Sequence, residues 1–297
     1  MNDPNDPLPI AEIVRFLQAK NGTQCRWPQP SDRVGFAFST KDRVSFTRQA
    51  LEAMDTDGGY DIIWNDGSDD AEARALPETY RFRNARLVEV NHDVRRGADG
   101  TICYGLARVL DHGYDYVGII ENDVVLQPGW FKKLMNLFVL AAADGIVCGA
   151  ATVRSFESRV IEHRSGYSLN WATGAGMILF SRPAAEIILR KYPILSWTST
   201  SLTNFYRRLF RIELGIRIQD EQGQWNDREV RFVPDWGFSP MLYMHGFASV
   251  GNIPSIARDL EFPPGHFLLN DYVKPERNNV GLIRLRSAAP QLQRVTS

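Results

Sequence analysis

YVGIIENDVVLQPGW, residues 116–130, is the stretch of sequence that most clearly indicates the fold. Its first half is an apolar run that predicts a strand over 116–123, and the turn residues 127–129 separate this strand from an amphipathic helix expected from Trp130 to about Ala142. A strand that is apolar on both faces is typical of a parallel sheet with helices packed on each side. The stretch therefore predicts one strand–helix unit of an α/β protein.

The same alternation continues before and after this stretch. Apolar runs predict further strands at residues 34–40, 61–66, 87–91, 145–152 and 177–181. Apolar residues at helical spacing predict helices near 46–54, 102–110 and 183–191. Because alternating strands and helices form βαβ units, the sequence predicts an α/β fold with a mainly parallel, twisted sheet flanked by helices.

Length and composition limit the number of domains. The 297 residues are 44% hydrophobic and 23% charged, which suffices for one large core. Residues 1–33 are rich in Pro, Asn and Asp, and we expect them to form an N-terminal appendage. A single domain is expected over 34–275, followed by a tail over 276–297.

Charge and cysteine content exclude several classes of protein. The formal net charge is −1, so no overall positive field favours a nucleic-acid partner. Cys25, Cys103 and Cys148 are widely spaced, which argues against a disulfide framework and against a zinc site. The sequence has no secretory signal and no apolar run of about 18 residues, so we expect a cytoplasmic protein.

Polar side chains follow four of the predicted strands, at the point where each strand ends. They lie at residues 40–43, 66–69, 91 with 95–96, and 121–123. The carboxyl ends of parallel strands meet at one edge of a sheet, and such folds bind ligands there. In the last group, Glu121 and Asp123 direct their carboxylates to the same side of an extended backbone. One or two carboxylates and a diphosphate would complete a Mg²⁺ or Mn²⁺ site; the alternative is an ordinary acidic turn.

Several stretches together are similar to one enzyme family. They are VGFAFSTKDR (34–43), IIWNDGSDD (62–70), Asn91 with Arg95-Arg96-Gly97, IIENDVVLQPGW (119–130), WATGAGMILFSR (171–182) and PDWGFSPMLYMHG (234–246). In this order they resemble the motifs of inverting GT-A glycosyltransferases of family 2, over roughly residues 34–250. The resemblance implies a GT-A fold, with a Rossmann-like nucleotide-sugar half over 34–152 and an acceptor half over 153–275.

The resemblance also implies a role for individual residues. Asp123 would be the metal carboxylate, with His266 as an additional metal ligand, and Asp235 would be the base that deprotonates the acceptor hydroxyl. Asp66 matches the aspartate that pairs with the edge of the nucleobase. The implied nucleotide-sugar site consists of Thr40, Arg43, Asp66, Asn91, Arg96, Glu121 and Asn122. Three positions, Asn65, Glu121 and Pro234, carry residues that differ from those usual in the family.

Some of these residues have plainer interpretations. Asp235 suits the cap of a helix predicted over 238–244, and Arg96 suits a solvated basic turn. Residues 201–219 mix aromatic and aliphatic side chains with four arginines. This segment could lie on an anionic membrane, which would place the protein at the inner membrane face; it could also cover the sugar site or join two subunits of a homo-oligomer.

The implied function is that of a metal-dependent, inverting glycosyltransferase. It would move a sugar from a nucleotide diphosphate such as UDP to a hydroxyl of a glycan or lipid-linked glycan, as in polysaccharide biosynthesis. One alternative is a non-catalytic sugar- or partner-binding protein of the same fold. A sugar nucleotidylyltransferase is a weaker alternative, because residues 39–43 contain no glycine with which to bind a triphosphate.

Overall fold

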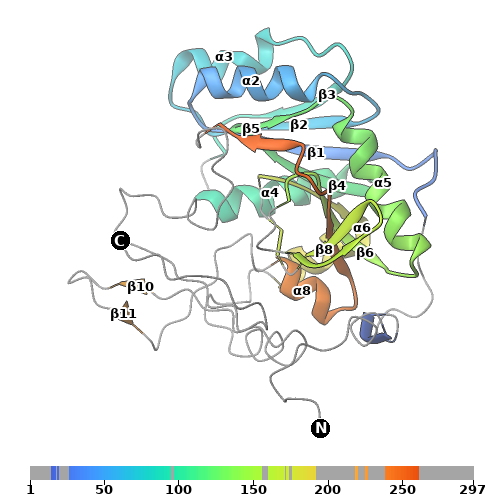
Figure 1. Cartoon of the computed structure of the whole chain (residues 1–297). Coiled ribbons are helices and arrows are strands. Elements are labelled where there is room, and N and C mark those ends of the chain that lie inside the picture. The colour runs from blue at the N-terminus through green and yellow to red at the C-terminus, as the bar shows by residue number, and fades with distance from the viewer. Residues whose placement is uncertain are drawn as a thin grey trace.

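A nine-stranded sheet forms the centre of the molecule (Figure 1). The computed structural model describes residues 15–17, 19, 27–94, 97–155, 160–170, 172–173, 176–191, 218–219, 225–226 and 238–260. The strand order is β3-β2-β1-β4-β9-β6-β12-β8-β7. The strands are β1 (Val34–Thr40), β2 (Asp61–Asp66), β3 (Arg86–Asn91), β4 (Tyr116–Glu121), β6 (Cys148–Thr152), β7 (Val160–Arg164), β8 (Tyr167–Asn170), β9 (Met177–Ser181) and β12 (Ala248–Gly251).

Most strands of this sheet run in one direction. The pairs β1–β2, β2–β3, β1–β4 and β6–β12 are parallel, whereas β8 and β9 are antiparallel to their neighbours. Two short pairs stand apart from the sheet: β5 (Val124–Leu126) with β13 (Ala257–Asp259), and β10 (Ile218–Gln219) with β11 (Trp225–Asn226). The mainly parallel sheet that the sequence predicts is therefore confirmed.

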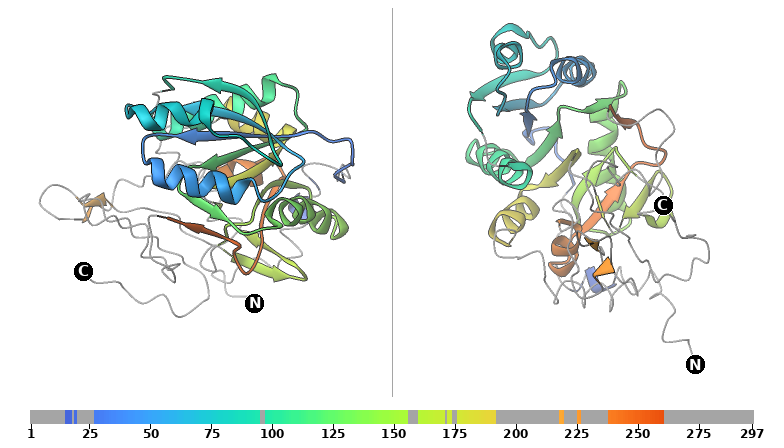
Figure 2. Two further views of the ribbon diagram at one scale, coloured as in Figure 1. Left: turned by 90° about the horizontal axis from the view of Figure 1, so that it is seen from above. Right: turned by 90° about the vertical axis from the view of Figure 1, so that its left-hand side faces the viewer.

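Helices cover both faces of the sheet. They are α2 (Val44–Met54), α3 (Ala71–Thr79), α4 (Gly97–Asp111), α5 (Trp130–Ala143), α6 (Arg182–Lys191) and α8 (Phe238–Met244). In the right-hand view of Figure 2, α4, α6 and α8 lie on one side and α5 on the other. In agreement, α6 packs against α4 and α8, while α5 packs against β6, β8 and β12. The sheet therefore lies between two layers of helices, and each of its faces is buried.

The core on the α5 face is built from aromatic rings. Phe36 of β1 packs edge-to-face against Tyr60 and Trp130, with ring centroids 5.4 and 5.6 Å apart. Gly118 of β4 lies opposite Phe36 in the parallel register. A Cβ atom at Gly118 would lie 2.2 Å from the Phe36 ring, so only glycine fits beside this ring without movement.

Sequence patterns located the long elements well and the short ones poorly. The strands expected at 34–40, 61–66 and 177–181 have those bounds, and the expected helix from Trp130 extends to Ala143. The strand expected over 145–152 begins only at Cys148. In that segment Gly145 has a φ of 70° and belongs to the turn after α5, which delays the strand.

Several expectations fall outside the described residues. These are the roles of Arg96, Asp235 and His266, the tail over 276–297, and nearly all of segment 201–219. Among the helices that the structure does describe, none combines the length and apolarity needed to cross a bilayer.

We expect Gly118→Ala to destabilise the fold by about 1–3 kcal/mol, because the added methyl group overpacks against Phe36. Urea unfolding measures the loss. Phe36→Leu should itself be destabilising, but the double variant should be more stable than the sum of the two losses predicts, since the smaller side chain makes room for the methyl group. Additive losses would show that the two positions do not clash.

Candidate functional site

The order of the strands changes direction at β1. From β1 the chain adds β2 and β3 on one side, and α4 then returns it to β4 on the other side. Open α/β sheets bind ligands at the carboxyl ends of the strands where the order reverses. We call this place the β1–β4 junction; it brings residues 40–43, at the end of β1, close to residues 121–123, at the end of β4.

Side-chain contacts connect the two chain segments at the β1–β4 junction. Asn122 Nδ2 donates a hydrogen bond of 2.9 Å to Thr47 Oγ1 on α2, and one of 3.5 Å to the carbonyl oxygen of Asp42. Arg43 Nη1 lies 3.6 Å from Asp123 Oδ2. The acidic triplet and the loop after β1 therefore lie in contact where the two strands end.

The loop after β1 has a strained backbone. Asp42 and Arg43 have φ values of 52° and 55°, in the left-handed region that non-glycine residues seldom adopt. Each such residue costs of the order of 1–3 kcal/mol, and the cost is tolerated where the surroundings fix the conformation. Strain of this kind gathers at functional sites, and here it directs Arg43 toward Asp123.

Asp42 fixes this conformation and joins two loops. Its Oδ1 accepts hydrogen bonds from the main-chain N–H groups of Asp69 and Asp70, at 2.8 and 3.0 Å. Its own N–H donates to Ser68 Oγ at 2.8 Å. The loop after β1 is thereby held against the loop after β2 and the start of α3.

Asp66 lies in a buried polar cradle beside the junction. Its Oδ1 accepts hydrogen bonds of 3.1 Å from Thr40 Oγ1 and from the N–H of Ser68. Trp64 Nε1 in turn donates to Thr40 Oγ1 at 2.9 Å, so the threonine hydroxyl orients Asp66. Oδ2 of Asp66 is buried and has no hydrogen-bond partner in the described part of the chain.

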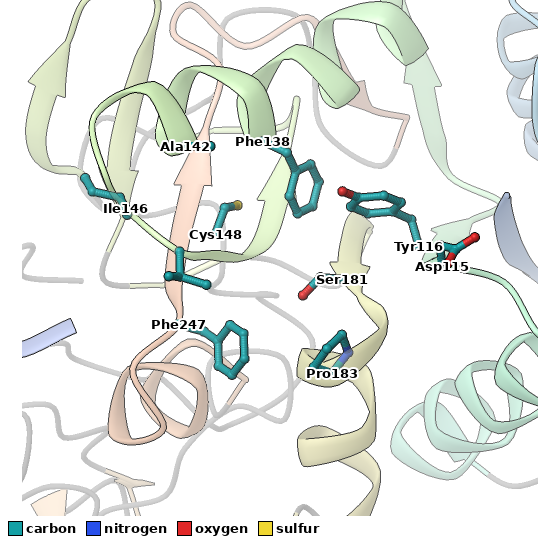
Figure 3. Close-up of a pocket in the computed structure, with 10 residues that line it drawn as sticks. Asp115, Tyr116, Phe138, Ala142, Ile146, Cys148, Ser181, Pro183 and Phe247 are labelled. Atoms are coloured by element: carbon teal, nitrogen blue, oxygen red, sulfur yellow. The ribbon is translucent and has the colours of Figure 1, made fainter. Parts of the chain in front are cut away.

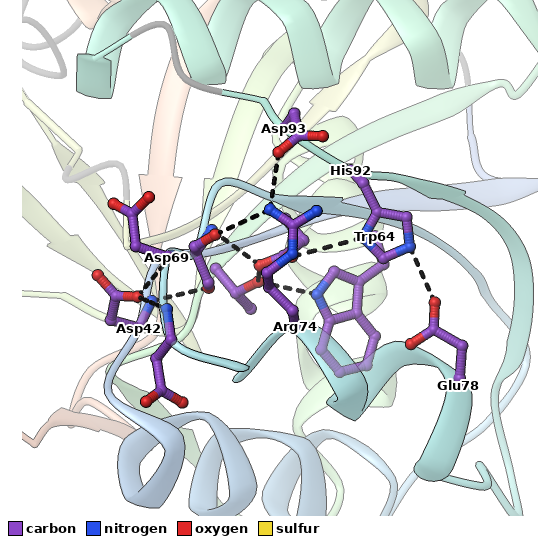
Figure 4. Close-up of polar contacts among 11 residues, drawn as sticks. Asp42, Trp64, Asp69, Arg74, Glu78, His92 and Asp93 are labelled. Carbon is purple, nitrogen blue, oxygen red and sulfur yellow. Dashed lines mark hydrogen bonds and ion pairs between the residues drawn. The ribbon is translucent and has the colours of Figure 1, made fainter. Parts of the chain in front are cut away.

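Charged side chains of both signs surround this cradle. His92 Nδ1 lies 3.5 Å from Asp66 Oδ2, in a geometry that makes no hydrogen bond, and Nε2 of the same ring lies 2.8 Å from Glu78 Oε1. Arg74 donates to Asp93 Oδ1 at 2.7 Å (Figure 4). Among the described residues, Asp66 Oδ2 thus accepts no hydrogen bond, and the His92 imidazole lies beside it.

A second row of polar side chains lies on the opposite face of the same edge. Ser39 is in register with Asn65 of β2 and with Glu121 of β4, and Asn65 is in register with Asn91 of β3. Asn91 Nδ2 donates to Asn65 Oδ1 at 3.1 Å. The buried atoms Ser39 Oγ and Asn65 Nδ2 have no hydrogen-bond partner among the described residues, and Asn65 Nδ2 lies beneath Gly105 of α4.

Asn91 also belongs to an ion-pair network at the end of β3. Burial raises the pKa of Glu89, but hydrogen bonds from His112, Asn91 and Arg108 outweigh it and hold the pKa below its usual value. Glu89 accepts from Arg108 at 2.8 Å and lies 2.7 Å from His112 Nε2. Asn91 is thus positioned from two sides, by Glu89 and by Asn65.

The side chains at the β1–β4 junction fit a divalent metal ion only if a bound molecule supplies further oxygen atoms to it. The side chain of Asp123 is 21% exposed, and Arg43 lies beside it. The described residues contain no group of three or more His, Cys, Asp or Glu side chains placed to hold a metal ion. Mg²⁺ and Mn²⁺ accept a single protein carboxylate when phosphates and water complete the coordination, so Asp123 with a diphosphate is a consistent site.

Sequence reasoning identified the strand ends but missed residues that organise them. The described predicted residues Thr40, Arg43, Asp66, Asn91, Glu121, Asn122 and Asp123 all lie at the carboxyl edge. Asp42 and Ser68 belong to the polar groups predicted at 40–43 and 66–69 but were given no role of their own, and Thr47 and His92 were not predicted. All four bind or face these residues. Asp42 followed a strand and was detectable as a turn former, whereas Thr47 lies within a helix and carries no signal in the sequence.

A cavity of about 90 Å³ lies at the other edge of the sheet (Figure 3). Its lining comes from the starts of β4 and β6, the end of β9, and α5. Ser181 Oγ is buried there without a hydrogen-bond partner in the described residues, and one water molecule can satisfy it. Because the lining is otherwise largely apolar and far from the carboxyl edge, this cavity is not part of the candidate site.

Comparison with known proteins gave structural likeness only. No family model and no curated protein matches the chain. The mannosyltransferase PcManGT from Pyrobaculum calidifontis, in complex with GDP-Man and Mn²⁺, is 19% identical over 61% of this chain, with a TM-score of 0.38. The apo form of the glycosyltransferase GlyE from Streptococcus pneumoniae TIGR4 is 13% identical over 74%, with a TM-score of 0.41. Residues 1–349 of TarS from S. aureus are 8% identical over 76%, with a TM-score of 0.44.

The likeness covers only part of each of these structures. The matched region spans 57% of the mannosyltransferase, 45% of GlyE and 59% of the TarS fragment. At such identities and TM-scores, function has to be argued from the residues of this chain.

We expect Asp42→Ala to destabilise the protein by about 1–3 kcal/mol, because the N–H groups of Asp69 and Asp70 lose their acceptor. Asp42→Asn is the matched control: it keeps an acceptor oxygen, and asparagine tolerates a positive φ, so its loss should be clearly smaller. Thermal and urea unfolding of both variants measure the difference. Equal losses would mean that the two hydrogen bonds contribute nothing.

Proposed function

We propose that this chain is a glycosyltransferase that moves a sugar from a nucleotide diphosphate to an acceptor hydroxyl, with a divalent metal and inversion at the anomeric carbon. The observation that carries the proposal is the β1–β4 junction, where Arg43 lies 3.6 Å from the carboxylate of Asp123 next to the buried cradle of Asp66. Arg43 offers a cation for the phosphates, Asp123 a carboxylate for a metal ion, and Asp66 a hydrogen-bond acceptor for the nucleobase. These three groups at one edge of the sheet suit a nucleotide diphosphate.

The proposed nucleobase carries an imide N–H group. Asp66 Oδ2 is a buried acceptor without a hydrogen bond in the described part of the chain, and a buried acceptor favours a ligand that donates to it. Uracil and thymine donate from N3 and guanine from N1, whereas the corresponding atoms of cytosine and adenine accept. Uridine, thymidine and guanosine donors therefore fit this position. Asn91, Arg96 and Glu121 are proposed to contact the rest of the nucleotide-sugar.

The proposed metal is Mn²⁺ or Mg²⁺. Among the described residues, Asp123 is its proposed ligand. When bound it would neutralise charge on the leaving diphosphate. Leu260 N donates to the main-chain carbonyl oxygen of Asp123 at 2.7 Å, so the chain lies beside the backbone of Asp123 six positions before His266. Six extended residues span at most about 20 Å, which keeps His266 within reach as a further ligand. Arg43 is proposed to contact the phosphates once the metal occupies Asp123.

Asp235 is the proposed base for the acceptor hydroxyl. It precedes Phe238 of α8 by three positions and lies outside the described residues. Ser239 Oγ of α8 accepts from the N–H of Thr173, just before β9, so α8 begins at the same sheet edge as Asp123. The acceptor, proposed to be a glycan or lipid-linked glycan, would approach from this side. Contact of segment 201–219 with a membrane or a second subunit stays a prediction.

We expect UDP, dTDP or GDP to bind with an affinity that rises on addition of Mn²⁺. Asp123→Asn should abolish that metal-dependent gain and weaken binding in Mn²⁺ at least about tenfold, because the metal loses its carboxylate. Calorimetry with and without Mn²⁺ measures both effects. Asp111→Asn, an exposed carboxylate on α4, is the charge-matched control. Failure of all three nucleotides to bind in any metal condition would refute the proposed function.

Asp66→Asn should shift the preference among nucleobases. Oδ1 accepts from Thr40 and Ser68, so the asparagine oxygen takes its place and the NH₂ group replaces Oδ2. The site then offers a hydrogen-bond donor where it offered an acceptor. The affinity for UDP should fall about 10-fold or more, and the affinity for CDP should rise. Competition calorimetry with UDP and CDP measures the ratio, with Asp69→Asn as control in the same loop. An unchanged ratio would remove Asp66 from base recognition.

A further inference from the structure

A two-stranded ribbon separate from the main sheet supports the metal carboxylate. β5 begins at the residue after Asp123, and β13 runs antiparallel to it with Asp259 opposite Val124. The next residue, Leu260, donates its N–H to the carbonyl oxygen of Asp123 at 2.7 Å. The backbone of Asp123 is therefore held by the end of β13.

A buried ion pair anchors that end of β13. Asp259 Oδ2 accepts from Arg154 Nη2, and both side chains are more than nine-tenths buried. Arg154 lies two residues beyond the end of β6, so its contact with Asp259 ties the ribbon to the main sheet. The residues between β12 and β13 strengthen the tie, because Ile256 N donates to the carbonyl oxygen of Val153 at 3.0 Å.

Arg154 supports the acidic triplet from its other end as well. A Cβ atom on Gly176 would lie 2.9 Å from Arg154 Nη1 and 2.9 Å from Val124 Cγ2, so the guanidinium packs closely against this glycine. The carbonyl oxygen of Gly176 accepts the N–H of Glu121 at 2.9 Å. One buried guanidinium thus contacts the segments that hold Glu121 and Asp123.

The ion pair is a costly way to stabilise a fold. Two charges that leave water lose their hydration, and a well-packed apolar pair of similar size is often at least as stable. What charges add is direction, because a guanidinium and a carboxylate attract each other in a narrow range of geometries. A pair in this place fixes the position of β13 and, through Leu260, the position of Asp123.

We propose that Arg154 and Asp259 are positioning residues for the metal carboxylate. This inference rests on the proposed function. The two side chains would act through Leu260 and Gly176 on the backbone of residues 121–123, and not by contact with the metal or the donor. Groups that orient a metal ligand from behind alter metal affinity about 10–100-fold when they are replaced.

Two variants test this role by different routes. Asp259→Asn keeps the shape of the side chain but removes the charge that Arg154 faces. Gly176→Ala keeps both charges and pushes sterically on Arg154 and on Val124 of β5, so it displaces the same contacts by another route if Asp259→Asn folds poorly. The matched control is Asp144→Asn, which breaks the more exposed Arg164–Asp144 pair of 3.0 Å with the same change in net charge.

Two measurements apply to each variant, well below its melting temperature. Hydrogen exchange of peptides that cover 121–126 and 257–260 reports whether the ribbon still holds Asp123. Electron paramagnetic resonance of free Mn²⁺, in the presence of the nucleotide diphosphate that wild type binds best, gives the affinity for the metal.

The inference predicts faster exchange at Leu260 and at least about tenfold weaker Mn²⁺ binding in Asp259→Asn and Gly176→Ala, with both quantities unchanged in Asp144→Asn. Unchanged exchange, or faster exchange with wild-type Mn²⁺ affinity, would overturn it, since the pair would then serve stability alone. If wild type binds no Mn²⁺ with any nucleotide, the proposed function fails by itself. Exchange at Leu260 still decides whether the ion pair fixes the backbone of Asp123.

Discussion

Parallel backbone hydrogen bonding of β1 with β2 and β4 decides which side chains share the candidate site. It sets Thr40 beside Asp66 on one face, and Ser39 beside Asn65 and Glu121 on the other. Because successive side chains of a strand point to opposite faces, a slip of one residue would transfer every one of these groups to the wrong side. The apolar residues of the same strands prevent that slip, since they would then leave the core. The position of the polar edge is thus a consequence of how the core is packed.

The acidic and polar residues at this edge are held rigidly before any ligand arrives. Main-chain N–H groups bind the carboxylate of Asp42, a hydroxyl and an N–H orient Asp66, and an amide ties Asn122 to α2. Groups fixed in this way lose little conformational freedom when they bind a ligand. The strained backbone of Asp42 and Arg43 belongs to the same arrangement, because the surrounding hydrogen bonds hold a conformation that these residues seldom adopt alone.

The first half of the fold was predictable from the sequence because its strands are long, apolar and regularly separated by helices. Beyond β6 the apolar strand β9 was predicted with its bounds, but sequences such as VIEHR in β7 or ASVG in β12 carry too few apolar residues for a pattern. In the same way, the edge residues Asp66 and Asp123 were predictable from strand ends. Contacts across the sequence, such as Asn122 with Thr47 or Arg154 with Asp259, depend on tertiary packing, which no local pattern encodes.

The place of β9 in the sheet has a consequence for how the chain folds. β9 fills the position between β4 and β6, pairing with β4 from Tyr116 to Ile120 and with β6 at Ala150 and Ala151. Until residues 177–181 have left the ribosome, β4 has an open, apolar edge with unpaired N–H and C=O groups, of the kind that pairs with other chains. The half that ends at Thr152 is therefore no independent folding unit, and a fragment cut there is prone to aggregate.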